Sequence, residues 1–174
     1  MESLVDRAME DGAVGLSTGL IYLPGTFAKT EELIALAKVA GRHGGIYASH
    51  MRDEGKGIYD ALEELFRIAR EAGVRAEVSH IKLSGKSSWG QPEKVLAAIE
   101  AARAEGLDIT QDQYVYTASS TGLSQLVPDK WREGGKFKEH LADPVEKTAM
   151  MTEMKRKLDS RSFEVKHSPI RPCV

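Results

Sequence analysis

Short apolar runs alternate with segments of helical periodicity along the first two thirds of this chain, and each run is followed by a polar stretch containing glycine. Successive runs begin about 30 residues apart, which is the length of one βαβ unit. Parallel strands separated by helices are therefore predicted. We expect helices over residues 3–10, 30–43, 58–71 and 93–104, and strands over residues 13–18, 46–50, 74–79 and 107–110.

The alternation is compatible with two architectures, a barrel and an open doubly wound sheet, and periodicity does not choose between them. Both gather their functional groups at the carboxyl ends of the strands. His50, His80 and Asp112 all fall at or just beyond such ends. At the start of the second helix, the Thr30 hydroxyl is expected to act as the cap.

The pattern loosens after Ser120. Residues 126–131 are expected to form a loop that enters a helix, and residues 144–158 a charged helix, with no fifth strand evident. We therefore expect one domain over residues 1–158 and an irregular C-terminal tail over residues 159–174.

Charge and composition argue against several classes of partner. The formal net charge is -2, with acidic and basic residues interspersed, so we expect no nucleic-acid partner and no membrane-surface partner. The sequence shows neither an apolar run of about 20 residues nor a signal peptide, which favours a cytoplasmic location. Cys173 is the only cysteine, so a local metal site would be built from histidine, carboxylate and water.

The strongest constellation is a pair of Ser-His dipeptides, each closing a predicted strand, at His50 and His80. Two imidazoles from neighbouring strands could converge on one metal ion. Zinc suits such ligands, and it lowers the pKa of a coordinated water. From spacing alone, a pair of hydrogen-bonded histidines at strand ends remains an equal alternative.

Four stretches of this sequence resemble the N-acyl-D-amino-acid deacylases, or D-aminoacylases, of the amidohydrolase superfamily. They are residues 15–25, 47–55, 79–82 and 112–121, and the likeness runs in order from about Ser3 to Leu158. The resemblance implies an α/β fold that is part of a (β/α)8 TIM barrel, with about four consecutive βα units. It also implies a zinc-dependent hydrolase that cleaves the amide bond of N-acyl-D-amino acids, its small-molecule partners.

The resemblance implies a role for each of six residues. His50 and His80 match the histidine ligands of the metal on the family's fifth and sixth strands. Lys82, Tyr114 and Ser120 match positions that bind the substrate carboxylate, and Tyr22 matches a tyrosine that lines the substrate pocket. An ammonium with two hydroxyls supplies several donors to an anion. Without the resemblance, Lys82 would be read as solvated and Tyr114 as a core aromatic residue.

Other polar residues are assigned to structural or surface positions. Arg52, Asp53 and Glu54 form a charged run beside His50 that we expect to be solvated and outside the site. Asp112 is expected to orient a strand end. The remaining histidines, which are His43, His140 and His167, are expected on the surface.

Parts of the family's active site have no counterpart in this sequence. There is no His-x-His pair, Cys173 does not match the family's bridging cysteine, and the aspartate of the eighth strand, the general base, is missing. No catalytic residue is therefore assigned. The chain is expected to be a fragment covering about the fourth to seventh strands and to be inactive alone. Zinc, one or two ions in the complete enzyme, would find a partial site.

Half a barrel would leave two strand edges without partners, which predicts a homo-oligomer formed through those edges. The competing function is a non-catalytic binding or assembly module that retains the fold. An unrelated parallel α/β protein that binds phosphate ranks last, because no glycine-rich phosphate loop is present.

Overall fold

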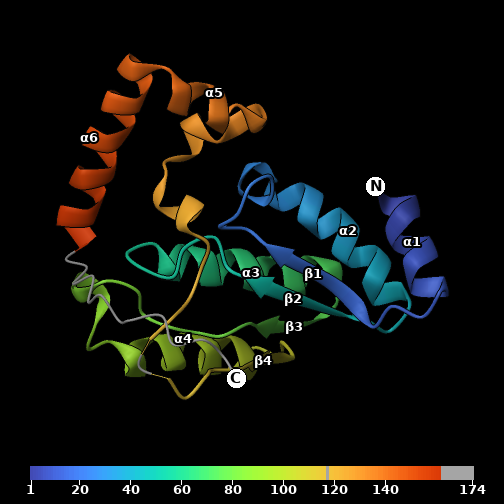
Figure 1. Ribbon diagram of the computed structural model, residues 1–174. Helices are drawn as coiled ribbons and strands as arrows, with labels where there is room; N and C mark the ends of the chain where they lie inside the picture. The colour runs from blue at the N-terminus through green and yellow to red at the C-terminus, as the bar shows by residue number, and fades with distance from the viewer. Residues whose placement is uncertain (117, 162–174) are drawn as a thin grey trace, which may run out of the picture. The chain divides into compact units, whose positions relative to one another are not determined.

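The computed structural model describes residues 1–116 and 118–161, which divide into two compact units. The first unit spans Met1–Gln125 and the second begins at Leu126. Helices and strands alternate through the first unit (Figure 1). They are α1 (Glu2–Glu10), β1 (Gly15–Gly19), α2 (Thr30–Arg42), β2 (Ile46–His50), α3 (Ile58–Ala72), β3 (Arg75–Val78), α4 (Pro92–Ala104) and β4 (Ile109–Gln111).

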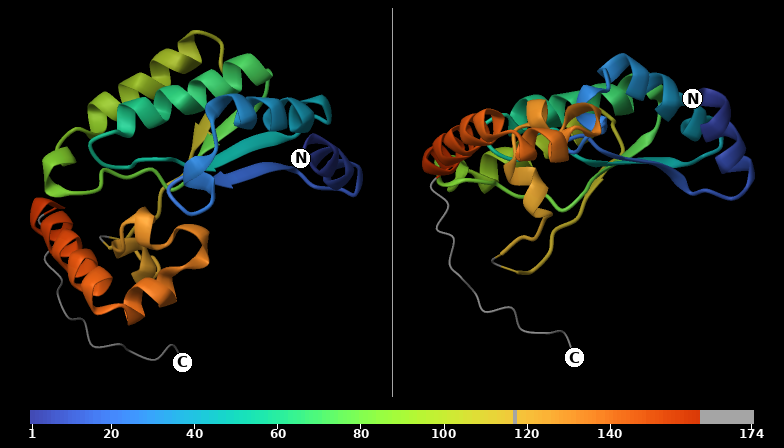
Figure 2. Two further views of the ribbon diagram at one scale, coloured as in Figure 1. Left: turned by 90° about the horizontal axis from the view of Figure 1, so that it is seen from above. Right: turned by 45° about the horizontal axis from the view of Figure 1, so that its top comes forward.

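The four strands form one parallel sheet in which the spatial order follows the chain order, β1-β2-β3-β4. Helices α2, α3 and α4 all cover the same face of this sheet, as the left view of Figure 2 shows. A doubly wound sheet reverses its strand order and carries helices on both faces. Winding in one direction with helices on one face is barrel geometry. The predicted partial (β/α)8 barrel of four βα units is confirmed.

The core lies between the sheet and these helices. Tyr47, Ala76 and Ile109 stand in one row across three strands, and each is at most 2% exposed. Helix α3 contributes Leu62, Leu65 and Ile68 to the same buried cluster. Strand residues that point to the other face are less buried, and Ser17 and Thr110 among them are exposed. The strands and the helices therefore share a single core on the helix-covered face of the sheet.

Three predicted strands begin later than expected because helix ends extend into them. The N–H of Val74 donates to the Ala69 carbonyl at 3.2 Å, and β3 begins at Arg75. The N–H of Ala13 still donates to the Ala8 carbonyl, so β1 begins at Gly15. In the same way, the N–H of Leu107 donates to Ala102, and β4 begins at Ile109.

The predicted capping role of Thr30 is wrong. Helix α2 begins at Thr30 itself, its N-cap residue is Lys29, and no side chain caps it. The Thr30 hydroxyl instead donates to Glu64 of α3 at 2.8 Å. A tertiary hydrogen bond has replaced the local one that sequence reasoning assumed.

The second unit is helical in its described part. Short 3-10 turns at Asp129–Trp131 and Glu133–Gly135 lead to helices α5 (Phe137–Ala142) and α6 (Pro144–Arg161). Its small core consists of Val127, Trp131 and Met150. The expected helix near residues 144–158 is present, and the described residues contain no fifth strand.

Two other expectations, the domain boundary at residue 158 and self-association through the strand edges, stay predictions. Most of the expected tail, residues 162–174, lies outside the described residues, so the boundary at residue 158 is untested. Strands β1 and β4 are the two ends of the sheet, but no second chain is present to test self-association. Among the described helices, none is both long and apolar enough to cross a membrane.

The close approach of β1 and β2 generates a testable prediction. A methyl group at Gly15 would lie 2.3 Å from the carbonyl oxygen of Ile46, which is rigid backbone. Gly15→Ala is therefore expected to lower the free energy of unfolding by about 1–3 kcal/mol. Ser17→Ala, at an exposed position of the same strand, should change it by less than about 0.5 kcal/mol. Urea unfolding measures both, and equal effects of the two substitutions would contradict this packing.

Candidate metal centre

Two of the predicted ligands meet at the carboxyl end of the sheet. Strand β2 ends at His50, and His80 follows β3 by two residues. Because these strands are adjacent and parallel, the two imidazoles converge, with ring centroids 4.3 Å apart and planes at 69°. The structure therefore brings His50 and His80 together, as the spacing of the two Ser-His pairs suggested.

His80 has an unusual backbone conformation that Asp112 supports. Its φ is +41°, the left-handed region that residues other than glycine rarely adopt. The Asp112 carboxylate accepts the His80 backbone N–H, and the Asp112 N–H donates to Val78 at 3.2 Å. Asp112, which follows β4, thus orients the end of the neighbouring strand, the role expected for it.

Glu54 joins the two histidines, which the sequence analysis did not foresee. Its carboxylate is buried, and Oε1 lies 3.7 Å from His50 Nε2 and 3.2 Å from His80 Nδ1. One ligand atom from each of these three residues lies within 4.8 Å of the others. The expectation that Glu54 is solvated is wrong. Its position four residues after a strand-end histidine was the available signal.

The loop that carries Glu54 is tied to the loop after β3. The Ser84 N–H donates to the Glu54 carbonyl oxygen at 2.7 Å. Burial of the carboxylate therefore follows from the pairing of two loops, which has no periodic signature in the sequence.

Lys82 lies within the same cluster. Its ammonium contacts the Glu54 carboxylate, lies 2.9 Å from His80 Nδ1 and donates to the His80 carbonyl oxygen at 2.9 Å. It also lies 5.7 Å from the centroid of the Tyr114 ring. A buried carboxylate requires a cation, and Lys82 supplies it here.

The remaining predicted site residues differ in their placement. The Tyr22 ring, from the loop between β1 and α2, lies 4.7 Å from the His50 ring. Tyr114 is half-buried and within reach of Lys82. Ser120 is exposed, and among the described residues no hydrogen bond joins its side chain to the histidine cluster.

The electrostatics of His50 suit metal binding. Its Nε2 atom is buried and has no hydrogen-bond partner among the described residues. Burial lowers the pKa of His50, Glu54 opposes that shift, and the electrostatic influence of His80 and Lys82 adds to it. The neutral imidazole, which is the form that binds a metal ion, is therefore favoured. The His50 Nε2 atom, which is buried without a hydrogen bond among the described residues and lies beside the Glu54 carboxylate, is suited to coordinate a cation.

Apart from Glu54, the described residues that were expected outside the site do not belong to the histidine cluster. His43 lies 2.9 Å from Asp6 of α1, and His140 lies 3.8 Å from Glu146 in the second unit. His167 lies outside the described residues. Arg52 is not simply solvated, because it pairs with Glu64 at 2.9 Å.

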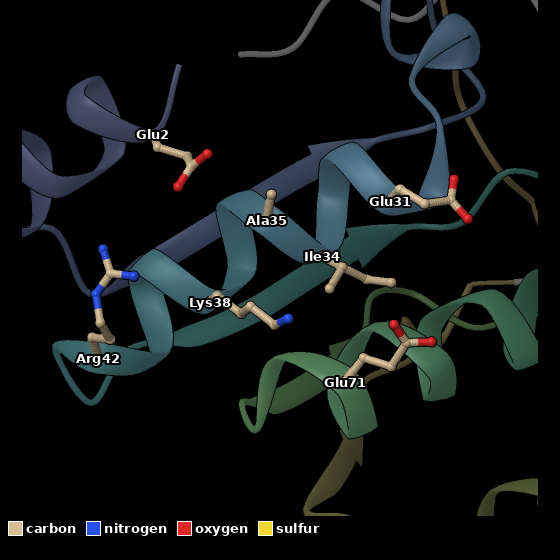
Figure 3. A pocket seen from close by; sticks show the side chains of 7 residues that line it. All are labelled: Glu2, Glu31, Ile34, Ala35, Lys38, Arg42 and Glu71. Atoms are coloured by element: carbon tan, nitrogen blue, oxygen red, sulfur yellow. The ribbon is translucent and has the colours of Figure 1, made fainter.

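A cavity of about 310 Å³ lies elsewhere, between helices α1, α2 and α3 (Figure 3). The residues that line it are Glu2, Glu31, Ile34, Ala35, Lys38, Arg42 and Glu71. These are mostly surface charges of both signs, and none belongs to the histidine cluster. It is a groove on the helical side rather than the chemical site.

Comparison with known proteins decides the family. The chain is 48% identical over 125 residues to a D-aminoacylase of Alcaligenes xylosoxydans xylosoxydans, covering 72% of this chain and 26% of that protein. It is 41% identical over 130 residues to an N-acyl-D-glutamate deacylase of the same organism, covering 75% and 26%. The chain belongs to the N-acyl-D-amino-acid deacylase family. It spans about a quarter of the length of these relatives, and no protein-family profile matches it.

Solved structures of this deacylase family agree. A D-aminoacylase that defines a subset of amidohydrolases matches with a TM-score of 0.66 and 47% identity, over 68% of this chain and 25% of that one. The N-acyl-D-glutamate deacylase of Bordetella bronchiseptica, solved with zinc and a phosphonate inhibitor, matches with a TM-score of 0.64 and 40% identity, over 66% and 24%. Another D-aminoacylase structure concerns a binuclear metal centre. The resemblance seen in the sequence is confirmed.

The lowered pKa of His50 generates a prediction about pH. In the metal-free chain, folded His50 binds a proton less readily than unfolded His50, whose ordinary value is 6.5. The free energy of unfolding should therefore fall as the pH drops below about 6.5, and His50→Gln should remove this contribution. Urea unfolding at several pH values and an NMR titration of the imidazoles measure it. A His50 pKa at or above 6.5 would contradict the described environment.

Proposed function

We propose that this chain carries part of the zinc site of an amidohydrolase, with His50, His80 and Glu54 as ligands. The observation that carries the proposal is the buried, unpartnered Nε2 of His50 beside His80 and a buried carboxylate. Two imidazoles and one carboxylate are a ligand set that zinc accepts. When bound, zinc acts as a Lewis acid toward water and an amide carbonyl.

We propose that the substrate is an N-acyl-D-amino acid, as the names of the relatives suggest. Lys82, Tyr114 and Ser120 would bind its carboxylate, and Tyr22 would line the pocket beside His50. The proximity of Lys82 to the Tyr114 ring supports a shared role for these two residues. An ammonium and a phenolic hydroxyl both donate to an anion, so they complement a carboxylate.

Hydrolysis of the amide bond is proposed for the complete enzyme rather than for these 174 residues alone. The sequence contains no His-x-His pair and no counterpart of the family's general-base aspartate. The residues of this chain would hold and orient the substrate and contribute ligands. Proton transfer at the scissile amide would need a group from outside the chain.

Removal of the two histidines tests the metal site directly. The chain is expected to hold close to one zinc ion after dialysis, and His50→Ala with His80→Ala should weaken zinc binding by about 100-fold or more, since ligands are lost. His43→Ala with His140→Ala is the matched control, because it removes two histidines that pair elsewhere. Elemental analysis and calorimetric titration measure the binding. Zinc retained by the first double variant, or absent from the wild type, would sink the proposal.

Lys82 and a divalent cation compete for the same Glu54 oxygen and His80 nitrogen. Lys82→Met should therefore raise zinc affinity about tenfold or more, because zinc no longer has to displace an ammonium from a buried carboxylate, a contact worth roughly 1.5–3 kcal/mol. Lys86→Met, at an exposed lysine of the same loop, removes the same charge without this contact. Competition with a zinc indicator measures both variants. Equal affinities would show that Lys82 does not occupy the cation position.

A further inference from the structure

Arg52 donates four side-chain hydrogen bonds, two to helix α3 and two to the loop between β1 and α2. It follows His50 by two residues, and its guanidinium is paired through two nitrogens with the Glu64 carboxylate, each at 2.9 Å. The same guanidinium donates to the carbonyl oxygens of Thr26 at 2.8 Å and Ala28 at 2.9 Å. The Arg52 and Glu64 side chains are 30% and 11% exposed.

The two carbonyls belong to the loop between β1 and α2, which also carries Tyr22. The Thr26 N–H donates to the Tyr22 carbonyl oxygen at 2.9 Å, and the Leu20 N–H donates to the backbone carbonyl oxygen of His50 at 2.9 Å. The loop also turns tightly, since a methyl group at Gly25 would lie 2.6 Å from the Gly19 carbonyl oxygen. A continuous chain of contacts therefore runs from Arg52 through this loop to Tyr22 and the His50 ring.

Glu64 makes this anchor rigid. It accepts two hydrogen bonds from Arg52 and a third from the Thr30 hydroxyl. The paired fork fixes the plane of the guanidinium, so its remaining donors point in fixed directions toward the loop. Helix α3 thus sets the position of a loop that is distant in sequence.

We propose that Arg52 is a positioning residue that fastens the loop of residues 20–29 so that Tyr22 covers the His50 imidazole. The inference rests on the proposed function, in which His50 would hold the metal and Tyr22 would line the substrate pocket. The placement of Tyr22 against His50 can be tested without zinc and without substrate. Failure of zinc binding would refute the proposed function and leave the positioning role to be judged separately.

A purely stabilising role for Arg52 predicts a different result from a positioning role. Stabilisation alone would lower the free energy of unfolding and leave the folded loop unchanged. Positioning predicts a local change in folded protein. Arg67 of α3 provides the matched control, because it is another arginine paired with carboxylates: it donates to Glu71 of its own helix at 2.7 Å and to Glu31 of α2 at 3.0 Å.

The test compares Arg52→Met, Arg52→Lys and Arg67→Met in the metal-free full chain. In Arg52→Met, amide hydrogen exchange over residues 20–29 should rise at least about tenfold, since charge-assisted hydrogen bonds are lost. The nuclear Overhauser contact between the Tyr22 ring and the His50 imidazole should disappear. Arg52→Lys, which keeps the charge but not the fork, should show a smaller rise, and Arg67→Met should match the wild type.

The proposal is overturned if folded Arg52→Met keeps both the wild-type loop exchange and the Tyr22 to His50 contact. It is also overturned if Arg67→Met loosens the loop equally. Should Arg52→Met fail to fold by circular dichroism, Arg52→Lys decides by the same two readouts, because its ammonium cannot serve Glu64 and both carbonyls at once.

Discussion

The parallel pairing of β2 with β3 is the constraint on which the candidate site depends. Their register places Ser49 beside Val78. One residue further, the Ser79 N–H donates to the backbone carbonyl oxygen of Ser49 at 3.1 Å. This register brings the histidine that ends one strand beside the histidine that follows the other. A slip of one residue would turn His50 to the opposite face and separate the pair. The hydrophobic row at Tyr47 and Ala76 opposes such a slip, so core packing and site geometry are fixed together.

Charge balance is the second determinant of the site. A carboxylate as buried as that of Glu54 needs positive partners, and here it contacts Lys82 and lies near two histidines. Burial meanwhile favours the neutral form of His50. The cluster therefore combines the Glu54 carboxylate, the Lys82 ammonium that a metal ion would displace, and the His50 Nε2 atom, which has no hydrogen-bond partner among the described residues. This combination accommodates a divalent cation with little rearrangement of the backbone, because the ligands already converge.

Elements with a strong period were predictable from the sequence, and so were residues at their ends. His50 and His80 follow from Ser-His pairs that close apolar runs, and α3 follows from its apolar stripe. Glu54 was missed because its burial depends on the pairing of two loops. Thr30 was assigned as a cap, although a partner from another helix competes for its hydroxyl. Tyr22, Tyr114 and Ser120 came from family resemblance alone, since nothing local distinguishes them.

The measurement that tests the central claim most directly is the X-ray absorption spectrum of the zinc-loaded chain at the zinc edge. The account predicts imidazole scattering from two histidines together with oxygen at about 2.0–2.2 Å. Loss of the imidazole scattering in the variant that lacks His50 and His80 would assign it to the strand ends. A spectrum dominated by sulfur at about 2.3 Å, or one without imidazole scattering, would contradict the account, because the metal would then bind away from the ends of β2 and β3.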